Sequence, residues 1–312
     1  MKPALVVIVG PTAVGKTRTS VEIAKAFKGE VINSDSMQVY TGLDIGTAKI
    51  KESEKEGIPH HLFDIKDPME DYSAAEFQED AQQKIAEIHQ KGSLPVMVGG
   101  TGLYIRAVTH DYTFTEASAD PDYRKELETF VSEYGSEALH DKLKAIDQKR
   151  ASEIHPNNVR RVIRALEIYH TQGYLDQEEN DQERESPYNL ITIGLTMDRD
   201  ELYDRINRRV DLMIEEGLLD EVKTLYEAGV RGTQAVQAIG YKELYSYFEG
   251  MCTLEEAIIK LKRNSRRYAK RQLTWFRHQM DVEWFDVTGG AINEKIPSIL
   301  AFVAGKLRLE SN

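Results

Sequence analysis

Residues 4–17, ALVVIVGPTAVGKT, decide the fold class of this chain. The apolar run 4–10 is typical of a central parallel strand that is buried on both faces. Residues 10–17 fit the pattern GxxxxGK(S/T), in which glycines let backbone N–H groups curl around phosphate oxygens. Lys16 would neutralise phosphate charge, and Thr17 would offer its hydroxyl to Mg²⁺. This segment therefore predicts a site for a di- or triphosphate, without saying which one.

Two later apolar runs also end in polar loops. Residues 30–33, EVIN, run into the polar SDS of 34–36, and residues 94–98, LPVMV, run into GGTG. A helical pattern over 72–90 separates them. Alternating strands and helices predict an α/β fold, here a P-loop NTPase-like core with a parallel sheet. Such sheets bind ligands at the carboxyl ends of their strands, where these polar loops lie.

An inserted all-helical domain is predicted over 112–187, because this stretch is charged and carries no convincing strand. Asp120-Pro121 would begin one of its helices, and the HPN of 155–157 another. Strand pattern then returns over 190–197, LITIGLTM. The α/β core would consist of residues 1–111 and 188–312, with long helices over 199–228 and 254–280.

Charge is unevenly distributed along the chain. The formal net charge is −12, which argues against a protein that binds nucleic acid over its whole surface. Residues 258–280, however, hold eight Lys or Arg and no Asp or Glu, whereas 176–185 hold six acids. Eight cations without an acid in the same stretch favour a local surface for an anionic partner over an ordinary solvated face.

The remaining bulk features place the chain among soluble proteins. Its single cysteine, Cys252, excludes an intramolecular disulfide, as suits a reducing cytosol. The N-terminal apolar run is too short to serve as a signal or to span a membrane. We therefore expect a cytoplasmic protein without a membrane partner. A monomer is our working expectation, although these features do not bear on the oligomeric state.

The residues that accompany the phosphate loop do not match a hydrolase. No Walker-B-type strand and no NKxD motif follows, and the candidate carboxylate is Asp35. Several rarer strings instead run through nearly the whole chain in order. They are DSMQVY (35–40), DIGTAK (44–49), VGGTGLY (98–104), HPN (155–157) with 160–166, QAIGYK (237–242) and AKRQLTWFR (269–277). With the phosphate loop, this set resembles the bacterial tRNA dimethylallyltransferase family.

The resemblance implies a reaction and its partners. The family transfers a dimethylallyl group from dimethylallyl diphosphate to the N6 amine of the adenosine 3′ of the anticodon in tRNA, and diphosphate leaves. The phosphate loop would then hold dimethylallyl diphosphate rather than ATP, with Mg²⁺ on Thr17. The tRNA would be bound through its anticodon stem-loop, with the target base extruded into a pocket.

Two residues are expected to handle the protons of the amine. An aryl amine is a poor nucleophile, so a base must take its proton as the new bond forms. Asp35, at a strand end beside the phosphate loop, is our choice, with a helix N-cap or a plain metal ligand as the alternatives. Thr101, at the next strand end, could accept the second hydrogen of the amine or serve as a turn or cap residue.

Cations aimed at the diphosphate would stabilise the leaving group. Arg205 and Arg209 lie one turn apart on one helix and share a face, whereas Arg208 points elsewhere. The resemblance places phosphate-binding arginine in this helix. The predicted diphosphate site consists of Gly10, Pro11, Thr12, Ala13, Val14, Gly15, Lys16, Thr17, Arg205 and Arg209.

The predicted tRNA-binding residues lie in six segments. Gln38 has an amide that could pair with a base edge. Arg160 and Arg164 share a helix face, and Trp275 in the cationic helix is expected to pack in the core. The full set is Asp35, Ser36, Met37, Gln38, Thr101, Arg124, Arg160, Arg161, Arg164, Gln237, Gly240, Lys242, Arg267, Lys270, Arg271 and Arg277.

Two other functions stay open at this point. A small-molecule kinase would use the same loop for ATP and Asp35 to activate a hydroxyl, but it leaves the cationic helix unexplained. A non-catalytic, nucleotide-dependent RNA-binding module explains that helix but not Asp35 and Thr101 at adjacent strand ends. The adjacent His60 and His61 are expected to be structural, because they would point to opposite faces of a strand.

Overall fold

The computed structural model describes residues 2–110, 112, 114, 120–173 and 185–308. The chain divides into two compact units. The first contains Met1–Tyr112 and Arg184–Asn312, and the second is Thr113–Glu183, in the part of the chain where the sequence predicts helices. Within the described residues, no helix combines the length and the apolarity that crossing a membrane would require.

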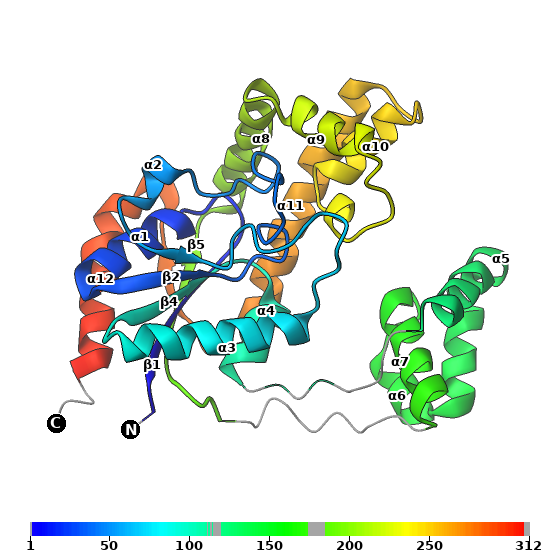
Figure 1. Cartoon of the computed structure of the whole chain (residues 1–312), viewed down its shortest axis with the longest axis horizontal. Helices are drawn as coiled ribbons and strands as arrows, with labels where there is room; N and C mark the ends of the chain where they lie inside the picture. The colour runs from blue at the N-terminus through cyan, green and yellow to red at the C-terminus, as the bar shows by residue number, and fades with distance from the viewer. Residues whose placement is uncertain (1, 111, 113, 115–119, 174–184, 309–312) are drawn as a thin grey trace. The chain divides into compact units, whose positions relative to one another are not determined.

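The first unit is built on a parallel sheet of six strands in the order β3-β2-β4-β1-β5-β6, which confirms the predicted α/β class (Figure 1). The strands are β1 (Ala4–Val9), β2 (Gly29–Asn33), β3 (His60–His61), β4 (Leu94–Val98), β5 (Asn189–Thr196) and β6 (Glu283–Asp286). In the register, Ile8 faces Val98, and Val98 also faces Asn33. The loops that follow β1, β2 and β4 therefore leave the sheet at one edge.

Alternate residues of β1 enter two different hydrophobic cores. Val6 and Ile8 pack in the core shared with α1 (Lys16–Phe27) and α12 (Ile292–Arg308). Leu5, Val7 and Val9 pack on the other face with α3 (Ala74–Gln90) and α4 (Gly102–Thr109). The strand is thus buried on both faces, as its unbroken apolar run predicts.

The remaining helices of the first unit stand beyond the carboxyl edge or connect the strands. The long helix predicted over 199–228 is two helices, because Gly217 has φ 103 and separates α8 from α9. The bounds are α2 (Glu52–Lys55), α8 (Arg199–Glu215), α9 (Leu218–Glu227), η1 (Ala235–Gln237), α10 (Tyr241–Phe248), α11 (Leu254–Gln279) and η2 (Thr288–Gly290).

The second unit has a small core of its own. It consists of α5 (Pro121–Ile146), α6 (Gln148–Glu153) and α7 (Val159–Gln172), packed around residues such as Leu143 and Leu166. Asp120 caps α5 by accepting the Tyr123 N–H at 3.0 Å, and Pro121 fills the first position, as predicted.

Candidate active site

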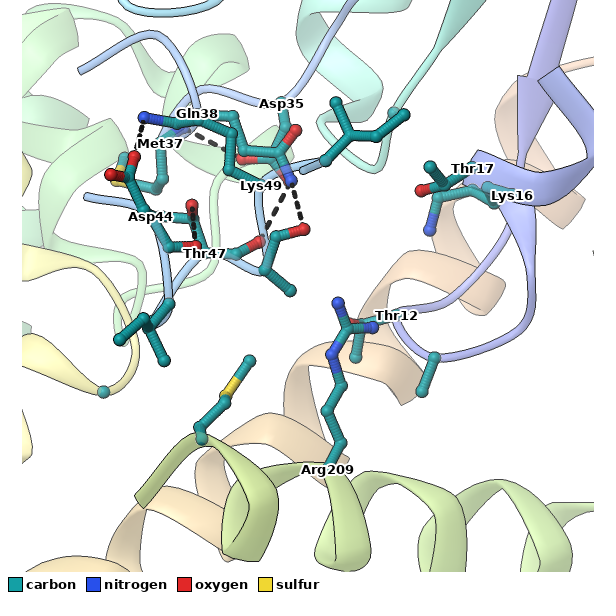
Figure 2. A pocket seen from close by; sticks show the side chains of 18 of the residues that line it. Thr12, Lys16, Thr17, Asp35, Met37, Gln38, Asp44, Thr47, Lys49 and Arg209 are labelled. Carbon is teal, nitrogen blue, oxygen red and sulfur yellow. Dashed lines mark hydrogen bonds and ion pairs between the residues drawn. The ribbon is translucent and has the colours of Figure 1, made fainter. Parts of the chain in front are cut away.

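A cavity of about 1590 Å³ opens at the carboxyl edge of the sheet (Figure 2). Its walls come from the phosphate loop, the segments 35–38 and 44–56, the helix α8, residues 237–242 and the inner face of α11. All of these segments belong to the first unit. Pockets for a single small ligand usually measure roughly 300–1000 Å³. This cavity therefore has room for two reactants.

The phosphate loop has the conformation that its glycines permit. Gly10 and Gly15 have φ values of 144° and 107°, which side-chain-bearing residues rarely adopt. A Cβ on Gly10 would also lie 2.6 Å from the Leu195 carbonyl oxygen. The Lys16 Nζ donates to the Gly10 and Pro11 carbonyls at 3.0 and 2.8 Å. Residues 12–17 line the cavity, whereas Gly10 and Pro11 lie outside its lining.

Lys16 is half-buried in the loop, and its partial removal from water changes its proton affinity. Burial lowers the pKa of the ammonium to about 8, the Asp35 carboxylate partly restores it, and Arg209 lowers it further. The ammonium is therefore stabilised mainly by the Gly10 and Pro11 carbonyls and the Asp35 carboxylate, and less by water. An anionic ligand entering the loop would supply the missing counter-charge.

Asp35 is a half-buried carboxylate that lines the same cavity. Its Oδ1 accepts the Met37 N–H at 2.9 Å in a tight turn, and no helix begins here, so the N-cap alternative is wrong. Burial raises the pKa of Asp35, against the opposing effects of the Met37 hydrogen bond and the Lys16 charge. A carboxylate with a raised pKa is better suited to take a proton.

Of the two arginines predicted beside the diphosphate, only Arg209 lines the cavity. Figure 2 shows it extending from α8 beside Thr12, with Lys16 and Thr17 to one side and Asp35 to the other. Arg205 does not belong to the lining, and its Nε lies 3.7 Å from Glu201 Oε1. One turn of helix places the Arg205 side chain outside the cavity lining, so its contact with a diphosphate stays a prediction. Arg208 is exposed, as expected.

Thr101 does not touch the cavity, although it stands next to it. Its hydroxyl oxygen accepts the Ser36 N–H at 3.1 Å and makes no cap hydrogen bond to α4. The Thr101 hydroxyl also donates to the Ser36 Oγ at 3.3 Å. Thr101 thus holds the residue that follows Asp35. Direct acceptance of an amine hydrogen stays a prediction.

The segment 35–38, which is predicted to contact the target base, is fixed by a loop that neighbours it in space. The Gln38 amide, which lines the cavity, donates to the Thr47 carbonyl at 3.0 Å. Glu221 of α9 in turn accepts three backbone N–H groups of this loop at 2.7–3.0 Å, and the Tyr241 hydroxyl at 2.5 Å. Glu221 was not predicted, because an acid in the first turn of a helix carries no signal of a distant partner. The N–H donors are Asp44, Ile45 and Gly46.

The predicted RNA-binding residues of the first unit surround the cavity or continue beyond it. Gln237, Gly240, Lys242 and Arg271 line the cavity itself. Arg267 is exposed on α11. A second cavity of about 240 Å³ includes Lys270 and Arg277. One of the eight cations has a compensating acid after all, since Lys262 pairs with Asp211 of α8 at 2.5 Å.

In the second unit the predicted arginines divide into two kinds. Arg160 and Arg161 are exposed at the start of α7. Arg124 instead forms a fork with the buried Glu167, at 2.8 Å from Nε and 2.6 Å from the terminal nitrogen. Arg164 lies 3.8 Å from the same carboxylate. Arg124 is therefore committed to the packing of α5 against α7.

Three aromatic or histidine predictions can be placed as well. Trp275 packs against Gly102, where a Cβ would lie 2.3 Å from the indole, in keeping with the expected packing role. His61 Nε2 lies 2.7 Å from Glu30 Oε2, and His60 Nδ1 lies 2.8 Å from the Ile58 carbonyl. Among the described residues, no group of three or more His, Cys, Asp or Glu could hold a metal ion.

Comparison with known proteins agrees with this arrangement. The model of the IPP transferase family matches residues 38–279. A tRNA dimethylallyltransferase of Halalkalibacterium halodurans is 62% identical over 100% of both chains. The chain belongs to the IPP transferase family. The family match begins at Gln38, and the full-length relative extends the similarity over the phosphate loop and Asp35.

Solved structures of the family have the same fold. The tRNA isopentenylpyrophosphate transferase of Bacillus halodurans is 61% identical, with a TM-score of 0.77, covering 99% of this chain and 98% of its own. A eukaryotic dimethylallyltransferase acting on tRNA is 31% identical, with a TM-score of 0.83, covering 99% of this chain and 80% of its own. These likenesses favour a prenyltransferase and do not favour the kinase interpretation.

Proposed function

We propose that this chain transfers the dimethylallyl group of dimethylallyl diphosphate to the N6 amine of the adenosine 3′ of the anticodon in tRNA. One observation carries the proposal. A half-buried carboxylate, Asp35, shares one cavity with two half-buried cations, Lys16 and Arg209. The reaction needs a base for the amine and cations for the diphosphate, and this cavity supplies both.

In the proposed step, the amine nitrogen bonds to the first carbon of the dimethylallyl group as the bond from that carbon to the diphosphate oxygen breaks. The amine proton passes to the Asp35 carboxylate, and diphosphate leaves. Asp35 is suited to this role because burial raises its pKa. Met37 holds the carboxylate through its N–H, so that little reorientation is needed during the reaction.

The leaving group would be stabilised from the opposite wall. The backbone N–H groups of the phosphate loop and the N-terminus of α1 attract an anion. Lys16 and Arg209 add two cations whose charges are screened less than in bulk water, because both side chains are half-buried in the cavity wall. As charge builds on the bridging oxygen, these groups would favour the transition state over bound substrate.

Mg²⁺ belongs to the same proposal. Thr17 lines the cavity with its hydroxyl, and Mg²⁺ typically takes one or two protein oxygens and completes its shell with water and phosphate. The residues present fit such a substrate-borne ion, since a protein cage is not required. When bound, the ion would neutralise diphosphate charge.

The tRNA would meet the cavity where its walls are cationic. Lys242 and Arg271 line the rim, and exposed Arg267 and Lys270 continue on α11. Single-stranded loops are read by such cations together with bases that are turned out of the stack. Arg160 and Arg161 are proposed to contact the anticodon stem-loop from the helical unit. A cytoplasmic, monomeric protein belongs to the same proposal.

The test is transfer of label from radiolabelled dimethylallyl diphosphate to unmodified tRNA, with Mg²⁺ and without ATP. Label in the tRNA is expected, and it would establish the reaction. No label, with RNA bound and ATP consumed in a parallel reaction, would mean that the phosphate loop serves ATP. RNA binding with neither product would mean a binding module.

A further inference from the structure

Gln272, on the inner face of α11, joins two loops of the site through its amide. Its Oε1 accepts the Thr12 N–H of the phosphate loop at 3.1 Å. Its Nε2 donates to the Gly100 carbonyl, in the loop that follows β4, at 3.1 Å. Gln272 is only 5% exposed, so both hydrogen bonds are shielded from water. One side chain thus connects the ends of two strands.

Gly100 leaves the space that this amide needs. A Cβ at position 100 would lie 2.0 Å from the Gln272 Nε2, far inside van der Waals contact. The φ of Gly100 lies outside the left-handed region, so the backbone itself does not demand glycine. The requirement for glycine here comes from Gln272.

The connection continues from Gly100 to the proposed base. The next residue, Thr101, accepts the Ser36 N–H at 3.1 Å, and Ser36 follows Asp35. Tyr268, one turn before Gln272 on the same helix face, adds its hydroxyl beside the same turn, 3.9 Å from where a Cβ on Gly100 would lie. The inner face of α11 therefore fixes the loop that would hold the leaving group and the segment that carries the base.

We propose that Gln272 is a positioning residue that sets the separation between the phosphate loop and the Asp35 side of the cavity. The inference rests on the proposed transfer reaction. In that reaction the diphosphate and the amine must be held on opposite sides of one carbon atom. A displacement of about 1 Å can cost about 100-fold in rate. Both ends of the Gln272 amide are hydrogen-bonded to backbone groups, of Thr12 and Gly100. Its contribution is therefore to hold the phosphate loop and the loop that follows β4.

The test uses the full-length protein and matched variants. Gln272→Met keeps the length of the side chain and removes both hydrogen bonds, whereas Gln272→Glu keeps an acceptor for Thr12 only. Gln279→Met is the control, because Gln279 lies on the same helix and accepts from Arg106 at 2.6 Å, away from the cavity lining. The single-turnover transfer rate and the Kd of each substrate are measured for every variant.

For Gln272→Met we expect a rate about 100-fold lower, with each Kd changed less than about threefold. The rate of Gln272→Glu should fall at least as far, because a buried carboxylate oxygen then faces the Gly100 carbonyl, and the rate of Gln279→Met should match that of wild type. A rate that falls only with the folded fraction, or a loss confined to one Kd, would overturn the positioning role. If wild type itself transfers no label, the proposed function fails instead.

A measurement that is independent of catalysis tests the Gln272 bridge separately from the proposed transfer reaction. Hydrogen exchange at the Thr12 amide should speed up about tenfold or more in Gln272→Met and stay unchanged in Gln279→Met, because the buried acceptor is lost. Unchanged exchange would contradict the bridge even if the enzyme is active.

A double-mutant cycle tests the link to Gly100. Gly100→Ala should lower the transfer rate about tenfold or more in wild type but little in a Gln272→Ala background, where the clashing amide is gone. Equal losses in both backgrounds would mean that Gly100 serves another purpose.

Discussion

Asp35 and Lys16 show how the cavity acts on single residues. Burial raises the pKa of the carboxyl and lowers that of the ammonium, so each ionised form is disfavoured. Each also sits in the field of the other, which partly restores both charges. The site therefore holds charges that cost stability and become useful when substrate arrives.

Asp35→Asn should lower the transfer rate about 10²- to 10⁴-fold and raise the stability of the fold at neutral pH. Since the folded pKa is raised above 3.8, the folded state binds more protons, and stability falls as pH rises through that window. Asparagine does not ionise, so the variant does not lose this stability and its Tm should exceed that of wild type at pH 7. Below about pH 3.8 the two Tm values should no longer differ in this way, because the carboxyl is then protonated in both the folded and the unfolded state. Thermal unfolding and single-turnover assays check this. Wild-type rates would remove Asp35 from the mechanism.

Deprotonation of Lys16 should lower kcat/KM at high pH. Its pKa of about 8 belongs to the free protein, whose ionisations appear in kcat/KM. For dimethylallyl diphosphate, kcat/KM should therefore fall about tenfold per pH unit above pH 8 as the cation is lost. Lys16→Arg, although slower, should lack that decline, because guanidinium does not titrate there. The same decline in both proteins would assign it to another group.

At the scale of elements, α9 acts as a clamp on the loop 44–46. Glu221 accepts three backbone N–H groups of that loop, and the Tyr241 hydroxyl as a fourth donor. The break at Gly217 makes this possible, because α9 begins anew there. Gly46 in turn leaves room for the Tyr241 ring. A Cβ on residue 46 would lie 2.6 Å from a carbon of that ring.

Glu221→Gln should destabilise the protein by about 2 kcal/mol, because either orientation of the amide turns a donor toward a backbone N–H. Urea unfolding measures the difference. Glu227→Gln on the same helix is the control, since Glu227 is exposed and 3.7 Å from Lys223, and should change stability by less than about 0.5 kcal/mol. Equal effects would contradict the clamp.

The central strands were predictable because unbroken apolar runs end in glycine or polar loops. Residues 94–98 match β4, and 4–10 differ from β1 by one residue. The edge strand β6 and the helix α12 were missed. β6 is only half-buried at the sheet edge, and Gly289, Gly290 and Pro297 obscure the helical pattern near and within α12.

The site was predictable where its chemistry is local in sequence. The phosphate loop and Asp35 follow strands directly, so topology alone brings them to one edge. The sequence could not show whether Arg205 or Arg209 lines the cavity, because only packing decides which turn of α8 faces it. Gln272 could not be found either, since it binds loops 172 and 260 residues away.

At the scale of the whole molecule, a net charge of −12 coexists with a cationic helix. Arg263, Arg267, Lys270 and Arg277 are exposed on α11. Binding to RNA should therefore be local and steeply dependent on salt, because each phosphate that is neutralised releases a counterion.

Arg267→Ala should weaken tRNA binding and reduce the slope of log K against log salt by about 1. The Kd for dimethylallyl diphosphate should not change. Lys306→Ala, an exposed cation on α12, is the control and should leave the slope as in wild type. Filter binding from 50 to 200 mM salt measures the slope. Equal slopes in all three proteins would place the RNA elsewhere.

The most direct test of the central claim is product analysis on two tRNA transcripts that differ at one nucleotide. One carries adenosine 3′ of the anticodon, and the other carries guanosine there. Both are incubated with the protein, dimethylallyl diphosphate and Mg²⁺, digested to nucleosides and examined by mass spectrometry. We predict N6-dimethylallyl adenosine from the first transcript and no modified nucleoside from the second. Unmodified adenosine in the first, or equal modification of both, would contradict the account.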